Sequence, residues 1–199
     1  MSKISKSPKE LKTDIMQACV LLFNQKGLKF TMDDVAKQCH ISKKTMYLIF
    51  IDKEELFLAM VDYVFDNVKL SESEVVSDKT LSFEDKLRKL LGVLPEGYTE
   101  IDFTQLYSLK DKYPNIYAKV ALRLESGWDA SIALIEEGKK QGLIRRDAHT
   151  EIIKMMFESS LERFFQSDVL VKNKISYNNA LKEVVNIIVD GVMIKEKEA

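Results

Sequence analysis

Several residue types are scarce in this chain of 199 residues, and each shortage excludes a class of protein. There are only two cysteines, Cys19 and Cys39, which cannot form a disulfide framework and are expected to be buried free thiols in apolar helical surroundings. The two histidines, His40 and His149, lack the paired ligands that a zinc site needs, so no metal is expected. No glycine-rich phosphate loop and no Ser-His-Asp order occurs, so we expect no cofactor and no enzyme.

Long apolar runs are also missing. No window approaches the ~18 uninterrupted apolar residues that indicate a membrane span. The N-terminal stretch is basic, but Asp14 and Gln17 interrupt the run that follows, so it lacks the apolar core of a signal peptide. We therefore expect no membrane partner and a cytoplasmic location.

Strand-like alternation is rare, whereas helical spacing of apolar residues recurs along the whole chain. Three prolines and seven glycines separate these periods. The pattern predicts an all-α fold of about nine helices. The polar stretch after Leu70, LSESEVVSDKTLS, is expected to be a loop or a frayed end, and Gly127 is expected to bend a long helix locally. The clearest of the predicted helices cover 8–26, 43–50, 52–70, 115–141, 150–166 and 176–194.

Two short helical patterns between residues 31 and 50 are joined by a tight turn at Cys39-His40-Ile41. Met46 and Phe50 are predicted to pin one side of the second helix, 43–50, onto its neighbours. The other side would stay free, as in a helix-turn-helix whose second helix enters the DNA major groove. An ordinary helical hairpin with solvated lysines is the alternative. The free side carries Lys43, Lys44, Thr45 and Tyr47.

Charge is divided unevenly along the chain. Up to Lys53 there are ten lysines and five acidic residues, a balance of +5, so the remainder carries −6 of the total of −1. A basic N-terminal part beside an acidic remainder indicates a polyanionic partner at one end.

The ordered motifs ACVLLF, TMDDVA, ISKKTMY and FIDKEEL resemble the TetR family of transcriptional regulators over about a quarter of the chain. The resemblance implies an all-helical dimer with a DNA-reading head at 1–52. A body at 53–199 would dimerise and bind an effector. It implies double-stranded DNA as partner, with these residues in contact with it: Thr31, Ser42, Lys43, Lys44, Thr45, Tyr47 and Lys53.

Some positions depart from the family pattern. His40 stands where glycine is usual in the turn, and histidine tolerates the left-handed backbone conformation better than most residues. Leu48, Ile49 and Ile51 replace side chains that often help to hold the DNA backbone. Lysines of the N-terminal arm would then supply some of the lost affinity: Lys3, Lys6 and Lys9.

The body offers two further expectations. The last two predicted helices are apolar on nearly two sides, which favours a homodimer through them, although a helix buried within one chain has the same pattern. Aromatic residues between the body helices are candidates for an effector pocket, with Trp128 beside Gly127 the best of them, although each could simply fill the core. These candidates are Phe65, Tyr98, Phe103, Tyr107, Trp128 and Phe157.

Together these features predict a ligand-responsive repressor that binds a near-palindromic operator as a homodimer with an unknown small-molecule effector. An activator is one alternative. Another is a helical ligand-binding or scaffold protein whose degenerate head no longer binds DNA, which the apolar residues at 48 and 49 favour.

Overall fold

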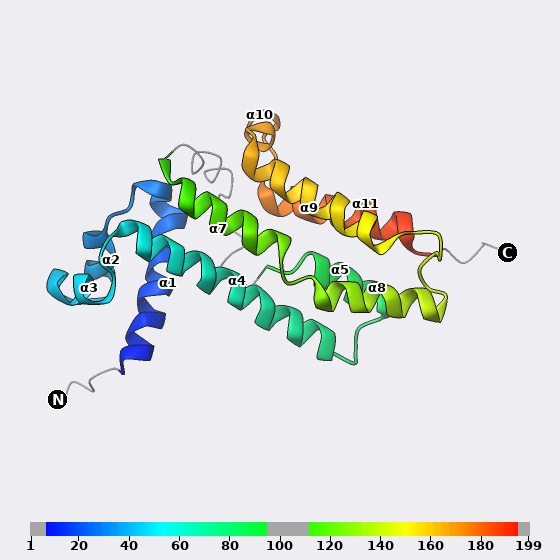
Figure 1. Cartoon of the computed structure of the whole chain (residues 1–199), viewed down its shortest axis with the longest axis horizontal. Helices are drawn as coiled ribbons and strands as arrows, with labels where there is room; N and C mark the ends of the chain where they lie inside the picture. The colour runs from blue at the N-terminus through cyan, green and yellow to red at the C-terminus, as the bar shows by residue number, and fades with distance from the viewer. Residues whose placement is uncertain (1–6, 95–111, 195–199) are drawn as a thin grey trace.

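The computed structural model describes residues 7–94 and 112–194, and these residues form an all-α fold, which confirms the predicted fold class. In the described part of the chain the only β-type pairing is an isolated bridge between Ile144 and Met193. None of its helices is long and apolar enough to cross a membrane. The helices, shown in Figure 1, are α1 (Pro8–Lys26), α2 (Met32–Gln38), α3 (Lys43–Ile49), α4 (Lys53–Ser77), α5 (Phe83–Leu91), α7 (Pro114–Glu125), α8 (Asp129–Gln141), α9 (Thr150–Gln166), α10 (Val169–Asn173) and α11 (Tyr177–Val192), with a 3-10 turn at Gly27–Lys29.

Side-chain caps fix where the helices of the head begin. Thr31 and Ser42 each accept a hydrogen bond from a backbone N–H three residues later, at 3.2 and 3.0 Å. Asp52 does the same at the start of α4, at 2.8 Å. These bonds satisfy N–H groups that have no partner inside the helix, so the sequence alone located these starts.

Two predicted helices have different bounds in the structure. Helix α4 continues to Ser77 and does not stop near Leu70, because the side chain of Glu72 is buried and paired with Lys69 rather than solvated. The predicted helix over 115–141 is two helices, α7 and α8, separated at Gly127, whose φ is +79°. A Cβ at Gly127 would lie 2.6 Å from the Lys69 side chain, so the helix is interrupted at the point where Lys69 packs against Gly127. Helix α10 was not predicted.

Two clusters of buried side chains hold the molecule together. The first joins α1, α2 and α3 to the N-terminal halves of α4 and α7, and Phe30, Met46, Leu56 and Ile116 lie fully buried within it. The second lies among α5, α8, α9 and α11. Helix α4 runs from the small helices of the head along the body, and α7 lies beside it (Figure 1). Helix α4 is therefore the main connection between the head and the body.

The turn between α2 and α3 depends on one residue in the left-handed region. His40 has a φ of +55°, as the sequence predicted for the position where glycine is usual. The turn is held by backbone bonds from His40 N–H to Lys37 O (3.1 Å) and from Ile41 N–H to Ala36 O (2.9 Å). Since the His40 side chain is exposed, its conformation is imposed by the backbone of the turn and not by packing.

We predict that His40→Gly stabilises the protein by about 1 kcal/mol, because glycine adopts this conformation without the steric cost that a Cβ brings. Urea denaturation of the variant and of the wild-type protein measures the difference. His40→Ala is the matched control, since it removes the same imidazole and keeps the Cβ. Equal stability of the two variants would contradict the prediction.

Candidate nucleic-acid interface

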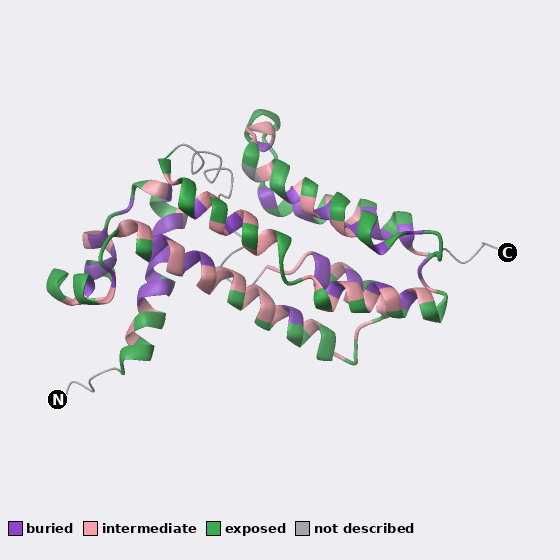
Figure 2. Cartoon of the chain, viewed as in Figure 1, coloured by how far each residue is buried: buried purple, intermediate pink, exposed green. Residues whose placement is uncertain are grey.

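Helix α3 is anchored along one side only. Met46 is completely buried, and Phe50, the C-cap of α3, is 2% exposed. Both predicted inward positions are thereby confirmed. Figure 2 shows the opposite side of this helix as exposed. A seven-residue helix held in this way presents a fixed surface without being stable by itself.

The outward side of α3 combines polar and apolar residues. Ser42, Lys43 and Lys44 are exposed at its start, and Tyr47 and Leu48 follow with 51% and 78% of their surface exposed. Lys44 is exposed, and among the described residues no ion pair engages it. Four of the predicted DNA-contacting residues, Ser42, Lys43, Lys44 and Tyr47, are therefore exposed together on α3 and at its start.

Lys43 is held by a neighbour. Its ammonium forms an ion pair with the carboxylate of Asp33 on α2, and this contact raises the pKa of Lys43. Both side chains remain substantially exposed, so the pair is weak and can open when a phosphate or a base edge competes for the lysine.

Thr31 and Thr45 are used locally. The Thr31 hydroxyl donates to Asp34 at 2.9 Å, and that carboxylate also accepts a bond from Lys26 at 2.8 Å. The Lys26 ammonium and the Thr31 donors hold the pKa of Asp34 well below its usual range. The Thr45 hydroxyl pairs with that of Ser42 at 2.8 Å. These hydroxyls position the starts of α2 and α3.

Lys53 lies in a different environment from the exposed lysines. Its ammonium donates to the carbonyl oxygen of Leu28 at 2.7 Å and lies 5.4 Å from the ring centres of Phe30 and Phe57 and 5.9 Å from that of Tyr113. Partial burial lowers its pKa. Lys53 therefore joins head to body through cation–π contacts. Of the N-terminal lysines, Lys9 is exposed in the first turn of α1, and Lys3 and Lys6 lie outside the described residues.

A cavity of about 160 Å³ lies mainly within the body and is lined by residues of α1, α4, α5, α7, α8, α9 and α11. Three of the predicted pocket residues line it: Phe65, Trp128 and Phe157. The Trp128 and Phe157 rings meet edge to face at 5.4 Å, and Trp128 Nε1 donates to Leu124 O at 2.8 Å. The other three predicted residues, Tyr98, Phe103 and Tyr107, lie outside the described residues.

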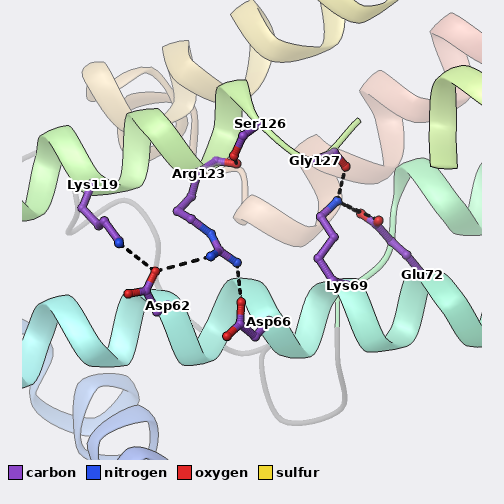
Figure 3. Close-up of polar contacts among 8 residues, drawn as sticks. All are labelled: Asp62, Asp66, Lys69, Glu72, Lys119, Arg123, Ser126 and Gly127. Carbon is purple, nitrogen blue, oxygen red and sulfur yellow. Dashed lines mark hydrogen bonds and ion pairs between the residues drawn. The ribbon is translucent and has the colours of Figure 1, made fainter. Parts of the chain in front are cut away.

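Sequence reasoning missed the charged residues of this cavity, which are Lys69, Glu72 and Arg123. Figure 3 shows how they connect α4 to α7 and to the segment that follows it. Arg123 bonds Asp66 at 2.6 Å, and Lys69 bonds both Glu72 and the carbonyl of Gly127. The i,i+3 spacing of Lys69 and Glu72 was a signal for the pair, but they fell at the end of a helix that was predicted to stop.

Comparison with known proteins agrees with this architecture. Residues 15–60 match the sequence model of bacterial regulatory proteins of the tetR family. YvaF of Bacillus subtilis, an uncharacterized HTH-type transcriptional regulator, is 24% identical over 176 residues, which cover 88% of this chain and 92% of YvaF.

Solved structures share the fold at lower identity. A TetR transcription regulator from Haloarcula marismortui superposes with a TM-score of 0.69 at 16% identity, covering 94% of this chain and all of the other. The transcriptional regulator FadR from Bacillus subtilis, in complex with stearoyl-CoA, has a TM-score of 0.61 at 17% identity, covering 90% of this chain and 98% of FadR. The fold and the exposed α3 define a DNA-binding helix-turn-helix regulator. Residues 15–60 therefore match the tetR family of bacterial regulatory proteins, and the whole chain has the fold of TetR regulators of known structure.

Proposed function

We propose that this protein is a ligand-responsive repressor that acts as a homodimer in the cytoplasm. The observation that carries the proposal is the one-sided burial of α3, which leaves Lys43, Lys44 and Tyr47 exposed while Met46 and Phe50 hold the helix in place. Two copies of α3 enter successive major grooves, about 34–36 Å apart, on a near-palindromic operator.

The residues of the head have different roles in this proposal. Lys44 and Lys43 reach base edges, and Lys43 leaves Asp33 to do so. Thr45, whose hydroxyl is paired with that of Ser42, reads a base edge with them. Ser42, Thr31 and Tyr47 contact phosphate and fix the register on the duplex. Lys53 acts on phosphate only if it leaves Leu28, so we expect it to add less affinity than the exposed lysines.

Exposed apolar residues on α9 and α11 support the homodimer. Ile152, Met155 and Met156 are 49–57% exposed on one side of α9, and Ile187 is 62% exposed on α11. The spacing of the three α9 residues puts them on one face. Exposed apolar residues that share one face of a helix are typical of a surface that a second copy covers.

The body cavity is the effector site in this proposal, and α4 transmits the effect of binding to the head. Helix α4 contributes Phe65, Lys69 and Glu72 to the cavity and contacts α1 in the head. An effector alters DNA binding only if it binds two arrangements of the heads with different affinity. A coupling of about 1–3 kcal/mol is ordinary for such a device.

We predict that Lys44→Ala lowers affinity for the preferred operator by about 10-fold or more and lowers affinity for random DNA much less, because a good base contact contributes about 1–3 kcal/mol of discrimination. Fluorescence anisotropy with labelled operator and random duplexes measures both. Lys79→Ala is the matched control, since it removes the same charge from an exposed site beyond the end of α4. An equal loss of affinity for both duplexes would show that Lys44 does not contact bases.

The second candidate function is a helical ligand-binding or scaffold protein without DNA binding. The exposed Leu48 and Ile51, at 78% and 79%, and the inward Lys53 favour it, because each reduces the cationic character of the head. A salt series separates the two, since phosphate contacts make affinity fall steeply as salt rises. A regulator shows that slope on its own genomic fragments, whereas a scaffold retains no fragment.

A further inference from the structure

One charged group in the body cavity is buried among apolar walls. The side chain of Glu72 on α4 is 12% exposed, and its carboxylate accepts bonds of 2.8 and 2.7 Å from the ammonium of Lys69. Lys69 also donates to the Gly127 carbonyl (Figure 3). A buried carboxylate must keep a cationic partner, because removing that partner leaves an uncompensated charge inside the protein.

The two members of this pair are not equally free to move. Lys69 is 38% exposed and ends in a flexible stem, so its ammonium can turn to solvent while its backbone stays in α4. The shorter, buried side chain of Glu72 cannot reach solvent in this way. A cationic ligand can therefore replace Lys69 at Glu72, whereas an anionic ligand at Lys69 would lie against the carboxylate of Glu72.

The remaining charged group of the cavity does not reverse this preference. Arg123 lies over the Phe65 ring at 5.4 Å and is already paired with Asp62 and Asp66 at 3.4 and 2.6 Å. Its positive charge is thus neutralised from the side of α4, and it offers little attraction to an anion.

Aromatic rings complete the environment. Trp128 and Phe157 line the same cavity in an edge-to-face pair. Ring faces attract ammonium groups, tryptophan most strongly, and the attraction grows when water is excluded. A carboxylate and two aromatic rings in an apolar cavity match a ligand that is both cationic and hydrophobic.

We propose that the effector of this protein is a hydrophobic cation, an amine or quaternary ammonium compound, whose charged nitrogen takes the place of Lys69 at Glu72. Its apolar part lies among the side chains of the cavity, against Trp128. This inference rests on the proposed role of the cavity as the effector site and adds the chemical class of the ligand. Displacing Lys69 also breaks its bond to Gly127, so binding is felt at the junction of α7 and α8.

The sole tryptophan of the chain, Trp128, provides a direct readout. We expect 4-phenylbutyltrimethylammonium to change its fluorescence and to bind at least about 10-fold more tightly than 5-phenylpentanoate, which has the same phenylbutyl chain and the opposite charge. Equal binding of the two probes, tighter binding of the carboxylate, or no binding of either would overturn the proposal.

Two variants of the ion pair sharpen the test, because the proposal predicts opposite effects. Glu72→Gln should lose at least about 10-fold in affinity for the cation, whereas Lys69→Met should bind the cation more tightly because the competing ammonium is gone. Loss of cation binding in Lys69→Met alone would contradict the proposed geometry. Glu72→Asp keeps the charge and should retain binding, and thermal melts with and without the probe establish that each variant is folded.

The test of the ligand class can fail or succeed independently of the test of DNA binding. DNA binding by the wild-type protein is measured in parallel by anisotropy, without any probe. A protein that binds genomic fragments but not the cation keeps its regulatory role and loses this ligand class. A protein that binds the cation but no DNA keeps the ligand class and loses the regulatory role.

Discussion

Replacing Met155 with glutamate should leave the protein monomeric and lower its affinity for operator DNA by about 100-fold or more, because two linked heads gain that much from binding together. Met155 is 57% exposed on α9, on the same side of the helix as Ile152 and Met156. In a dimer its side chain would be buried against the partner, and a carboxylate there would have no counter-ion.

Light scattering at several protein concentrations measures the association, and anisotropy with operator DNA measures its consequence. Leu70→Glu is the control, because Leu70 is 64% exposed on α4, away from α9 and α11, and the chemical change is of the same kind. The control should remain dimeric. A monomeric wild-type protein, or equal effects of the two changes, would rule out dimerisation through α9 and α11.

The head was predictable because its determinants are close together in sequence. Each cap and the residue it bonds are separated by three positions, as for Ser42 and Thr45, so reading a few residues at a time identifies them. The burial of Met46 and Phe50 followed from helical spacing in the same way. The φ of +55° at His40 was also local, since a tight turn between two helices requires one such residue.

The body was less predictable because its determinants are distant in sequence. Residues 71–77 were predicted to be a loop, yet they stay helical. Next to them Lys69, which is paired with Glu72, donates to the carbonyl of Gly127, 58 residues further along the chain. The same contact divides α7 from α8. No local pattern carries this information, since it depends on two segments packing together.

Lys53 shows the same limit in the candidate site. From sequence it is a lysine at the start of a helix, the type of residue that contacts phosphate. Its actual neighbours include Phe30, which lies 23 positions before it, and Tyr113, which lies 60 positions after it. The exposed positions of α3 were accessible to sequence reasoning because the spacing of Met46 and Phe50 alone determines which side faces outward.

Phe57 makes the aromatic contacts that join head and body, so we predict that Phe57→Ala costs about 3–5 kcal/mol of stability, the usual range for truncating a buried phenylalanine. Its side chain is 1% exposed. Its ring stacks on Phe30 at 4.9 Å and on Tyr113 at 5.9 Å, and it meets Phe23 edge to face at 6.4 Å. The change therefore removes contacts with α1, with the segment before α2 and with the start of α7 together.

Urea denaturation at one fixed protein concentration measures the cost, since stability of a dimer depends on concentration. Leu48→Ala is the control, because Leu48 is 78% exposed and its truncation should change stability by less than about 0.5 kcal/mol. A cost below about 1 kcal/mol for Phe57→Ala would show that the aromatic cluster does not hold the head on the body. Phe57→Ala also removes one of the aromatic rings around the ammonium of Lys53. That ammonium, at the start of α4, would then no longer be held in its position by Phe57. We therefore expect the DNA affinity of the folded fraction to change as well.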